Sequence, residues 1–362
     1  GRNLGDAYFG QGKASNFVDL DVLATGQIVR EMSASFDRYW NDDLAFPVQT
    51  LMSREDLDRL RPPPAPAAPA GQAPGTPDAK ALPPVASTAA APTLTSSILP
   101  GVTVTAPAPE TRVDLARLTL TWAPAILLVD KPGKIEPDQD EVAEGDTLID
   151  GLLQFMSSAQ KEIYIISPYF VPGAQMMKVF GDLRARGIRI HVLTNSLASN
   201  DAPAAHAGYA RYRKALLQMG VEIHEMRATQ EAGGSGMGSS ISLGGSSGGG
   251  SGGSRASLHS KVVVVDARVL VIGSMNLDLR SQLQNSEVAL IIRSRSMSAE
   301  AIRQIEATFR EGAYRVELRD GQLYWKAPEG ASFQDATGEP DAGLKLKLFV
   351  NILGPFAPDE ML

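Results

Sequence analysis

Apolar positions follow two alternating periods from residue 147 to residue 226. Stretches with apolar residues three or four apart predict helices, and short runs rich in Ile, Val and Leu predict strands. The predicted helices cover Thr147–Ser158, Met176–Arg186 and Ala207–Met219, and the predicted strands cover Glu162–Ile166, Ile188–Leu193 and Val221–Met226. Alternation of this kind implies an α/β fold with a largely parallel sheet flanked by helices.

Two loops follow these strands at the edge of the sheet where ligands commonly bind in α/β folds. They are Ser167-Pro168-Tyr169-Phe170 and Thr194-Asn195-Ser196. We therefore expect functional side chains to come from both loops.

A later apolar run, from residue 258 to residue 266, carries a histidine and a lysine two positions apart. Because the side chains of a strand alternate between its faces, His259 and Lys261 should share one face. The next apolar run leads to Ser274 and Asn276. An imidazole, an ammonium, a hydroxyl and an amide that converge at strand ends can bind a phosphate and attack it.

A carboxylate follows this group along the chain. Glu287 precedes the apolar run Val288–Ile292, from which it could hydrogen-bond the imidazole of His259 and orient it. The other histidines, at positions 191, 206 and 224, lack such neighbours, and we expect them to pack in the core or lie on the surface.

Two low-complexity segments divide the chain. The segment 61–110 is rich in Pro and Ala, a composition that buries too little apolar surface to fold and predicts an extended linker. The segment 233–254 is nearly all Gly and Ser and predicts a flexible loop shortly before His259. We favour a surface insertion over a mobile lid for this loop.

Composition and charge narrow the class of protein. Of the 362 residues 43% are hydrophobic, enough for a substantial core, and the absence of cysteine excludes disulfides and Cys-bound zinc. No clustered set of His, Asp and Glu suggests a metal site, and no apolar run reaches the roughly 18 residues of a membrane span. The net charge of −7 argues against a general nucleic-acid binder, which needs Lys and Arg.

The residues around His259 follow the pattern H-x-K-x4-D-x6-G-S-x-N. The pattern resembles the HKD motif of the phospholipase D superfamily. Every motif position is matched, by His259, Lys261, Asp266, Gly273, Ser274, Asn276 and Glu287. The resemblance implies an α/β fold of two phospholipase D-like lobes, each a mostly parallel mixed sheet flanked by helices, with the active site at their interface. It implies neither a cofactor nor a metal.

The start of the chain resembles the end of another copy of this motif. Asn3 aligns with Asn276, and Asp21 aligns with Glu287. We therefore expect the chain to begin inside a first HKD copy, whose His and Lys lie upstream of Gly1, and to be inactive by itself.

Three segments are similar to bacterial cardiolipin synthases of the C-type group: 167–173, 193–197 and 206–217. This resemblance implies transfer of a phosphatidyl group to phosphatidylglycerol, with phosphatidylethanolamine as the donor. It also implies a peripheral protein of the bacterial inner membrane, and leaves an accessory protein open. The residues expected to bind substrate are Arg2, Tyr169, Asn195 and Arg280.

The chemistry of the superfamily implies how the reaction would run. The histidine of the first copy attacks phosphorus to form a phosphohistidine, and His259 protonates the leaving alcohol and later acts as a base. Lys261, Ser274 and Asn276, with Asn3 from the first copy, would neutralise the charge of the phosphodiester.

Two carboxylates of the motif would act indirectly. Glu287 would fix the tautomer of His259, and Asp21 would be its counterpart in the first copy. Asp266 falls on the strand face opposite to His259, so we expect it to support the structure.

The resemblance and the low-complexity segments together predict five parts. These are a remnant of a first lobe (1–60), a linker (61–112), a second lobe (113–232 and 255–343), its Gly/Ser loop (233–254) and a tail (344–362). The tail is apolar with Lys345 and Lys347 at one end. It would either anchor the protein at a membrane surface or close the second lobe by packing.

Other functions share this kind of site. Water in place of the lipid acceptor would give a phospholipase D-type hydrolase. Other HKD enzymes cleave nucleic acid, which the negative charge of this chain disfavours. Outside the enzymes, the alternative is a non-catalytic half-site protein.

Overall fold

The computed structural model describes residues 2–9, 11–12, 15–60, 120–135, 147–228 and 255–353. The chain divides into two compact units, one formed by Gly1–Ala45 with Thr111–Leu362 and the other by Phe46–Glu110. The described part of the smaller unit holds two short helices, α2 (Val48–Leu51) and α3 (Arg54–Leu60). The predicted linker (61–112), the Gly/Ser loop (233–254) and the end of the tail (354–362) lie outside the described residues.

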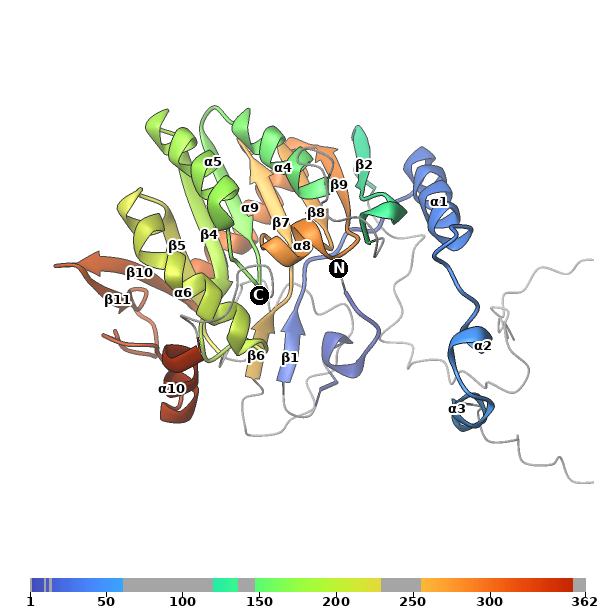
Figure 1. The fold of residues 1–362 in the computed structure, drawn as a ribbon. Helices are drawn as coiled ribbons and strands as arrows, with labels where there is room; N and C mark the ends of the chain where they lie inside the picture. Colours follow the sequence, from blue (N-terminus) through green and yellow to red (C-terminus); the bar gives the residue numbers. More distant parts are fainter. Residues whose placement is uncertain are drawn as a thin grey trace, which may run out of the picture. The chain divides into compact units, whose positions relative to one another are not determined.

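The larger unit is built on a nine-stranded mixed sheet with the order β11-β10-β5-β4-β3-β7-β8-β9-β2 (Figure 1). Its strands are β2 (Ala125–Val129), β3 (Glu162–Ile166), β4 (Arg189–Asn195), β5 (Glu222–Met226), β7 (Val262–Val265), β8 (Val269–Gly273), β9 (Val288–Arg293), β10 (Ala313–Arg319) and β11 (Gln322–Lys326). A second sheet pairs β1 (Ser15–Val18) with β6 (Arg255–Leu258) in parallel.

The predicted α/β class is confirmed, but the prediction of a mostly parallel sheet is wrong, because parallel pairing in the large sheet is confined to β3, β4 and β5. The other neighbouring pairs are antiparallel. Tight turns explain two of these antiparallel pairs, because two successive residues with positive φ reverse the chain at once. Asp266 and Ala267 have φ values of 53° and 51° between β7 and β8, and Asp320 and Gly321 have 49° and 76° between β10 and β11. A two-lobe arrangement stays a prediction.

Helices cover both faces of the large sheet (Figure 1). One face carries α4 (Leu148–Ser157), α5 (Gly173–Ala185) and α6 (Pro203–Gln218), and the other carries α9 (Arg295–Glu311). The four valines of β7 are all buried and alternate between the two cores, with Val263 and Val265 facing the first and Val262 and Val264 the second. This alternation is the period-2 pattern of a strand covered on both sides.

The helices and strands predicted between residues 147 and 226 are all present, with shifted ends. Thr147 caps α4, since its hydroxyl accepts a hydrogen bond from the Asp150 N–H at 3.1 Å and its own backbone N–H donates to the Asp150 carboxylate at 3.2 Å. The helix α6 begins at Pro203, earlier than predicted, because proline fits the first turn of a helix.

The remaining helices are short or lie at the edges of the larger unit. They are η1 (Asp6–Phe9), α1 (Gln27–Trp40), η4 (Pro132–Ile135), α8 (Leu279–Leu283) and α10 (Leu344–Leu353). None of the helices in the described ranges is long and apolar enough to span a bilayer.

Candidate active site

The small sheet brings the start of the chain to the HKD motif. In the parallel pair of β1 and β6, Val18 lies opposite Leu258. The residues that follow these two strands, Asp19 and His259, therefore lie side by side. The backbone N–H of His259 donates to the carbonyl of Val18 at 2.9 Å, and the hydroxyl of Ser260 donates to the same carbonyl at 3.1 Å.

Asp19 is the carboxylate partner of the motif histidine. Its Oδ2 lies 3.0 Å from His259 Nδ1, and the two residues are only 2% and 9% exposed. An ionised carboxylate at this distance favours the tautomer with its proton on Nδ1, which leaves Nε2 free to exchange protons. The structure thus provides a buried, oriented imidazole.

The sequence prediction assigned this role to Glu287, and the structure corrects it. Asp21, predicted to be the counterpart of Glu287 in the first copy, is paired with Arg2, whose Nε lies 2.7 Å from Asp21 Oδ2. The side chain of Asp21 is 41% exposed. Because β1 ends at Val18, the residue next along the chain reaches His259, and the aspartate two positions later does not.

Two aromatic rings from the same N-terminal segment pack on His259. The ring centroids of Tyr8 and Phe17 lie 4.9 Å and 5.3 Å from that of the imidazole, and they stack on each other at 4.3 Å. Their contacts limit how the imidazole can rotate. Nothing in the sequence pattern singled out Tyr8, whereas Phe17 lies within a short apolar run.

Lys261 is buried beside the histidine, as the HKD resemblance implies. It is 5% exposed, and its Nζ donates to the carbonyl of His259 at 2.6 Å. Burial lowers the pKa of Lys261 to about 8, while the charges of Asp19 and Glu287 oppose this shift. The side chain is therefore mostly a cation near neutral pH.

Glu287 binds two serines and not the imidazole of His259. Its Oε2 accepts a hydrogen bond from the Ser274 hydroxyl and its Oε1 one from the Ser281 hydroxyl at 2.9 Å. The N–H of Ser274 donates to the carbonyl of Val288, which places Ser274 next to Glu287 across β8 and β9. The predicted bond between Glu287 and His259 is therefore wrong for this structure.

A buried ion pair, Asp130–Lys134, binds the backbone of Glu287. The carboxylate of Asp130 lies 2.6 Å from Lys134 Nζ and accepts the backbone N–H of Glu287 at 2.9 Å. Lys134 also donates to the carbonyl of Ser281 at 2.9 Å. These contacts fix the backbone of Glu287 and of Ser281, one of the two partners of its carboxylate.

Asn276 has a free hydrogen-bonding atom at the site. Its backbone N–H donates to the Ser281 hydroxyl at 3.1 Å. Its side-chain Oδ1 is buried and has no hydrogen-bond partner among the described residues. Buried polar atoms are usually paired, so this acceptor is suited to a hydrogen-bond donor of a ligand, such as a hydroxyl.

Asp266 supports the fold, as expected. Its Oδ1 accepts the backbone N–H groups of Lys161 at 2.7 Å and Glu162 at 3.1 Å, and its Oδ2 accepts that of Gln160 at 3.0 Å. These bonds fix the start of β3 at the end of β7 remote from Lys261.

The four predicted substrate-binding residues have different environments. Asn195 is fully buried, and its amide bonds the N–H and carbonyl of Leu258 at 2.9 Å and 3.0 Å, so it holds the end of β6 and is not free to bind substrate. Tyr169 donates to Asp201 at 2.9 Å, and Arg280 is exposed. Arg2 is engaged by Asp21, and Asn3 of the predicted first copy donates to the hydroxyl of Tyr8 at 3.0 Å.

Comparison with known proteins agrees with this geometry. Residues 152–311 match the family model described as cardiolipin synthase, PLD-like domain. The chain is 33% identical to cardiolipin synthase C of Escherichia coli over 329 residues, which make up 90% of this chain and 62% of that protein. It is 26% identical over 363 residues to an uncharacterized protein of Helicobacter pylori, covering 96% of this chain and 61% of that protein.

Among solved structures, the phospholipase D family member Nuc from Salmonella typhimurium matches with a TM-score of 0.36 and 15% identity, covering 54% of this chain and 99% of that one. The chain spans about three fifths of the length of the two curated relatives, 62% and 61%. The family model covers His259, Lys261, Asn276 and Glu287. Residues 152–311 therefore form a phospholipase D-like domain of the kind described for cardiolipin synthases.

Proposed function

We propose that the protein transfers a phosphatidyl group to phosphatidylglycerol and so makes cardiolipin. The observation that carries this proposal is the buried Asp19–His259 pair beside the buried Lys261. The similarity to cardiolipin synthase C supports the lipid substrate. By that likeness the donor is phosphatidylethanolamine, and the protein works peripherally at the bacterial inner membrane.

Each site residue has a task in such a reaction. Lys261, with the amide of Asn276, binds the anionic phosphodiester and offsets its charge. A nucleophilic histidine forms a P–N bond as the P–O bond to the leaving alcohol breaks, and His259 Nε2 gives that oxygen a proton. In the second step, the hydroxyl oxygen of the acceptor forms a P–O bond as the P–N bond breaks, and His259 takes the proton of that hydroxyl. Asp19 stabilises the positive charge that then lies on the His259 ring.

The nucleophile of this scheme is a second histidine. The chain has three others, and each is held elsewhere: His191 lies 3.5 Å from Glu222, His206 lies 3.0 Å from Arg213, and His224 stacks on Phe309. By the superfamily resemblance, the nucleophile belongs to a first HKD copy. We expect the 362-residue chain by itself to be inactive.

The test is a product assay on the protein as encoded, with the residues that precede Gly1 in its gene. Phosphatidylethanolamine and phosphatidylglycerol are supplied in mixed micelles, and cardiolipin and phosphatidic acid are quantified by mass spectrometry. We expect cardiolipin, and none from a His259→Ala variant. Phosphatidic acid without cardiolipin would instead favour the hydrolase. If neither product forms, the protein is either a non-catalytic half-site protein or an enzyme that needs an accessory protein. Adding a cell extract to the assay would distinguish these two cases.

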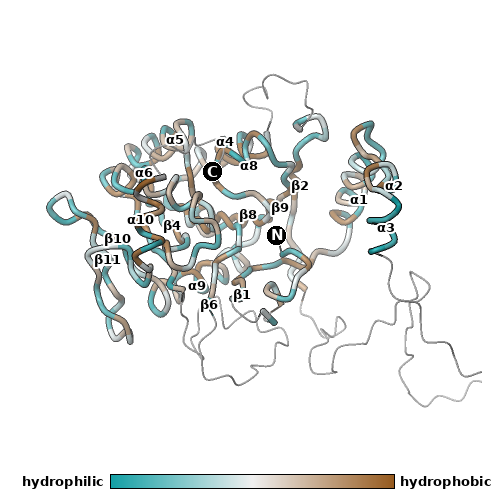
Figure 2. The backbone as a smooth tube through the Cα atoms, turned by 60° about the horizontal axis from the view of Figure 1, so that its bottom comes forward, coloured by the Kyte–Doolittle hydropathy of each residue, from teal (hydrophilic) through white to brown (hydrophobic). Residues whose placement is uncertain are grey.

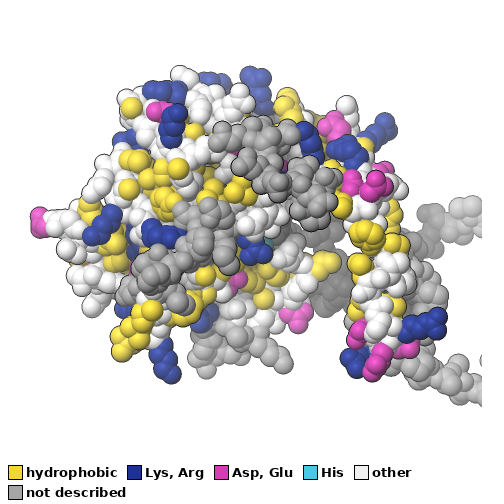
Figure 3. Space-filling view, in the orientation of Figure 1, with side chains coloured by type: hydrophobic (Ala, Val, Ile, Leu, Met, Phe, Trp, Pro, Cys, Tyr) yellow, Lys and Arg dark blue, Asp and Glu magenta, His cyan; other side chains and the backbone are white. Residues whose placement is uncertain are grey.

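We also propose that α10 touches the membrane. Leu346 and the buried Val350 pack on Leu197 and Ala207, so one face of α10 closes the lobe. On its other side, Leu344, Leu348 and Ile352 are 81%, 57% and 55% exposed, and the helix carries two lysines and no acidic residue (Figures 2 and 3). Membrane contact and packing against the lobe are therefore both supported for the tail, because different faces of α10 would carry them.

Replacing Leu348 and Ile352 with Glu is expected to weaken binding to phosphatidylglycerol vesicles by about tenfold, since two buried apolar side chains would be lost from the interface. Co-sedimentation measures the effect. The matched control replaces Leu120 and Ile126, which are 50% and 61% exposed elsewhere, with Glu. An equal loss in the control would mean that only added negative charge matters.

A further inference from the structure

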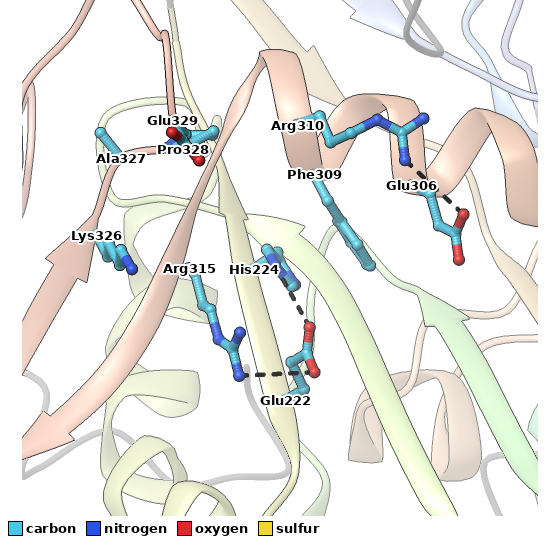
Figure 4. Close-up of a pocket in the computed structure, with 10 residues that line it drawn as sticks. All are labelled: Glu222, His224, Glu306, Phe309, Arg310, Arg315, Lys326, Ala327, Pro328 and Glu329. Carbon is cyan, nitrogen blue, oxygen red and sulfur yellow. Dashed lines mark ion pairs between the residues drawn. The ribbon is translucent and has the colours of Figure 1, made fainter.

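A pocket on the α9 face of the large sheet shares no lining residue with the site around His259 (Figure 4). Its volume is about 540 Å³. It is lined by side chains of β5, β10 and β11, by the last turns of α9 and by the segment that follows β11. The proposed transfer reaction uses none of these residues.

Three nitrogen-bearing side chains form a row across the pocket. His224, Arg315 and Lys326 lie directly opposite one another on β5, β10 and β11. Their strand neighbours, among them Ile223 and Trp325, are buried in the core on the other face, so the row faces α9. Two cations directly opposite each other on neighbouring strands repel, and Arg315 and Lys326 are such a pair.

The cations of the pocket retain unused donors. Arg315 lies 3.8 Å from Glu222, and Arg310 of α9 lies 3.8 Å from Glu306, distances too long for hydrogen bonds. Within the described ranges, neither arginine nor Lys326 donates a side-chain hydrogen bond. Figure 4 shows Arg315 and Lys326 on adjacent strands and Arg310 on α9, with the guanidinium of Arg310 directed toward Glu306.

The carboxylates and the histidine do not remove this capacity. Glu306 accepts a hydrogen bond from the hydroxyl of Tyr164 at 3.0 Å. A hydrogen bond with His191 lowers the pKa of Glu222 to about 2, so Glu222 is a carboxylate at pH 7, but it lies 3.8 Å from Arg315 and accepts no hydrogen bond from it. Glu329 also lines the pocket, and a bound phosphate must outweigh the charge of these carboxylates. Burial lowers the pKa of His224 to about 4, so its ring is neutral at pH 7. His224 is 5% exposed, and its Nδ1 has no hydrogen-bond partner among the residues that the structure describes.

We propose that this pocket binds a phosphate group, held between Arg315 and Lys326 on the sheet and Arg310 on α9. A dianion there would relieve the repulsion between Arg315 and Lys326 and accept the donors that the protein leaves unused. The phosphate can belong to a free small molecule or to the headgroup of an anionic lipid. The proposal is independent of the transfer reaction.

The His224 ring is a local reporter for this test. The chain has four histidines, so their ring-proton resonances in NMR spectra can be assigned by single substitutions. Inorganic phosphate is expected to shift the His224 resonance saturably in the wild type and in Lys261→Gln, which weakens phosphate binding at the HKD site. Substituting Arg315→Gln with Lys326→Gln is expected to weaken this response by about tenfold or more, because two charge-assisted contacts are lost.

The matched control is Arg303→Gln with Arg319→Gln, which removes the same charge outside the pocket from residues paired with Glu300 and Glu317. It should keep the response, as should Arg315→Lys. If phosphatidylglycerol vesicles compete with phosphate and phosphatidylcholine vesicles do not, the ligand of the pocket is the headgroup of an anionic lipid. If neither kind of vesicle competes, the ligand is a soluble phosphate compound. The proposal is overturned if neither phosphate nor vesicles shift His224, or if the control weakens binding as much.

Discussion

Replacing Asp19 with Asn is expected to lower kcat for phosphatidyl transfer by about a thousandfold while KM changes little. Asp19 is 2% exposed and its carboxylate meets Nδ1 of His259 at 3.0 Å. A neutral amide keeps the volume but no longer stabilises the imidazolium that forms when His259 takes up a proton. Steady-state kinetics on the protein as encoded measures the effect.

Asp21→Asn is the matched control for this prediction. The side chain of Asp21 is 41% exposed and pairs with Arg2, so its loss should change kcat by no more than about threefold. An Asp19→Glu variant keeps the charge and should recover part of the activity. The assignment to Asp19 fails if Asp19→Asn leaves kcat unchanged.

Replacing Arg213 with Met is expected to lower the free energy of unfolding by about 3–5 kcal/mol. The Arg213 side chain is fully buried, with Nη1 2.9 Å from Glu339 and Nε 3.3 Å from Glu225. Glu225 is itself fully buried, and burial raises the pKa of its carboxyl. Without Arg213 this charge has no cationic partner at that position. Denaturant titration followed by circular dichroism measures the change.

Lys214→Met on the same helix is the control. Lys214 is exposed and donates one hydrogen bond, to the carbonyl of Gly321 at 3.0 Å, so its loss should cost no more than about 0.5 kcal/mol. Adding Glu225→Gln and Glu339→Gln to Arg213→Met should recover part of the stability, because the uncompensated charges are then gone. A loss below about 1 kcal/mol for Arg213→Met would show that the buried ion pairs do not stabilise the fold.

The motif residues could be predicted from the sequence, whereas their hydrogen-bond partners could not. Lys261 is buried beside His259. The apolar pattern predicted that the two residues share one face of a strand, which is wrong, because both lie between β6 and β7. Asp266 holds the start of β3 as expected. Asn195 lies in one of the two predicted loops, but its amide is consumed by the backbone of Leu258. A sequence shows that a polar residue is near a site, and it does not show which atoms already have partners.

The sequence by itself determined the α/β class, the order of elements from residue 147 to residue 226 and the identity of the HKD residues. Local periods and motif spacing carry this information, because they arise from neighbouring residues in the chain. The tertiary structure alone decided that Asp19 orients His259 and that Glu287 binds Ser274 and Ser281. These pairings depend on strand register across up to 240 positions of sequence separation, which no local pattern encodes.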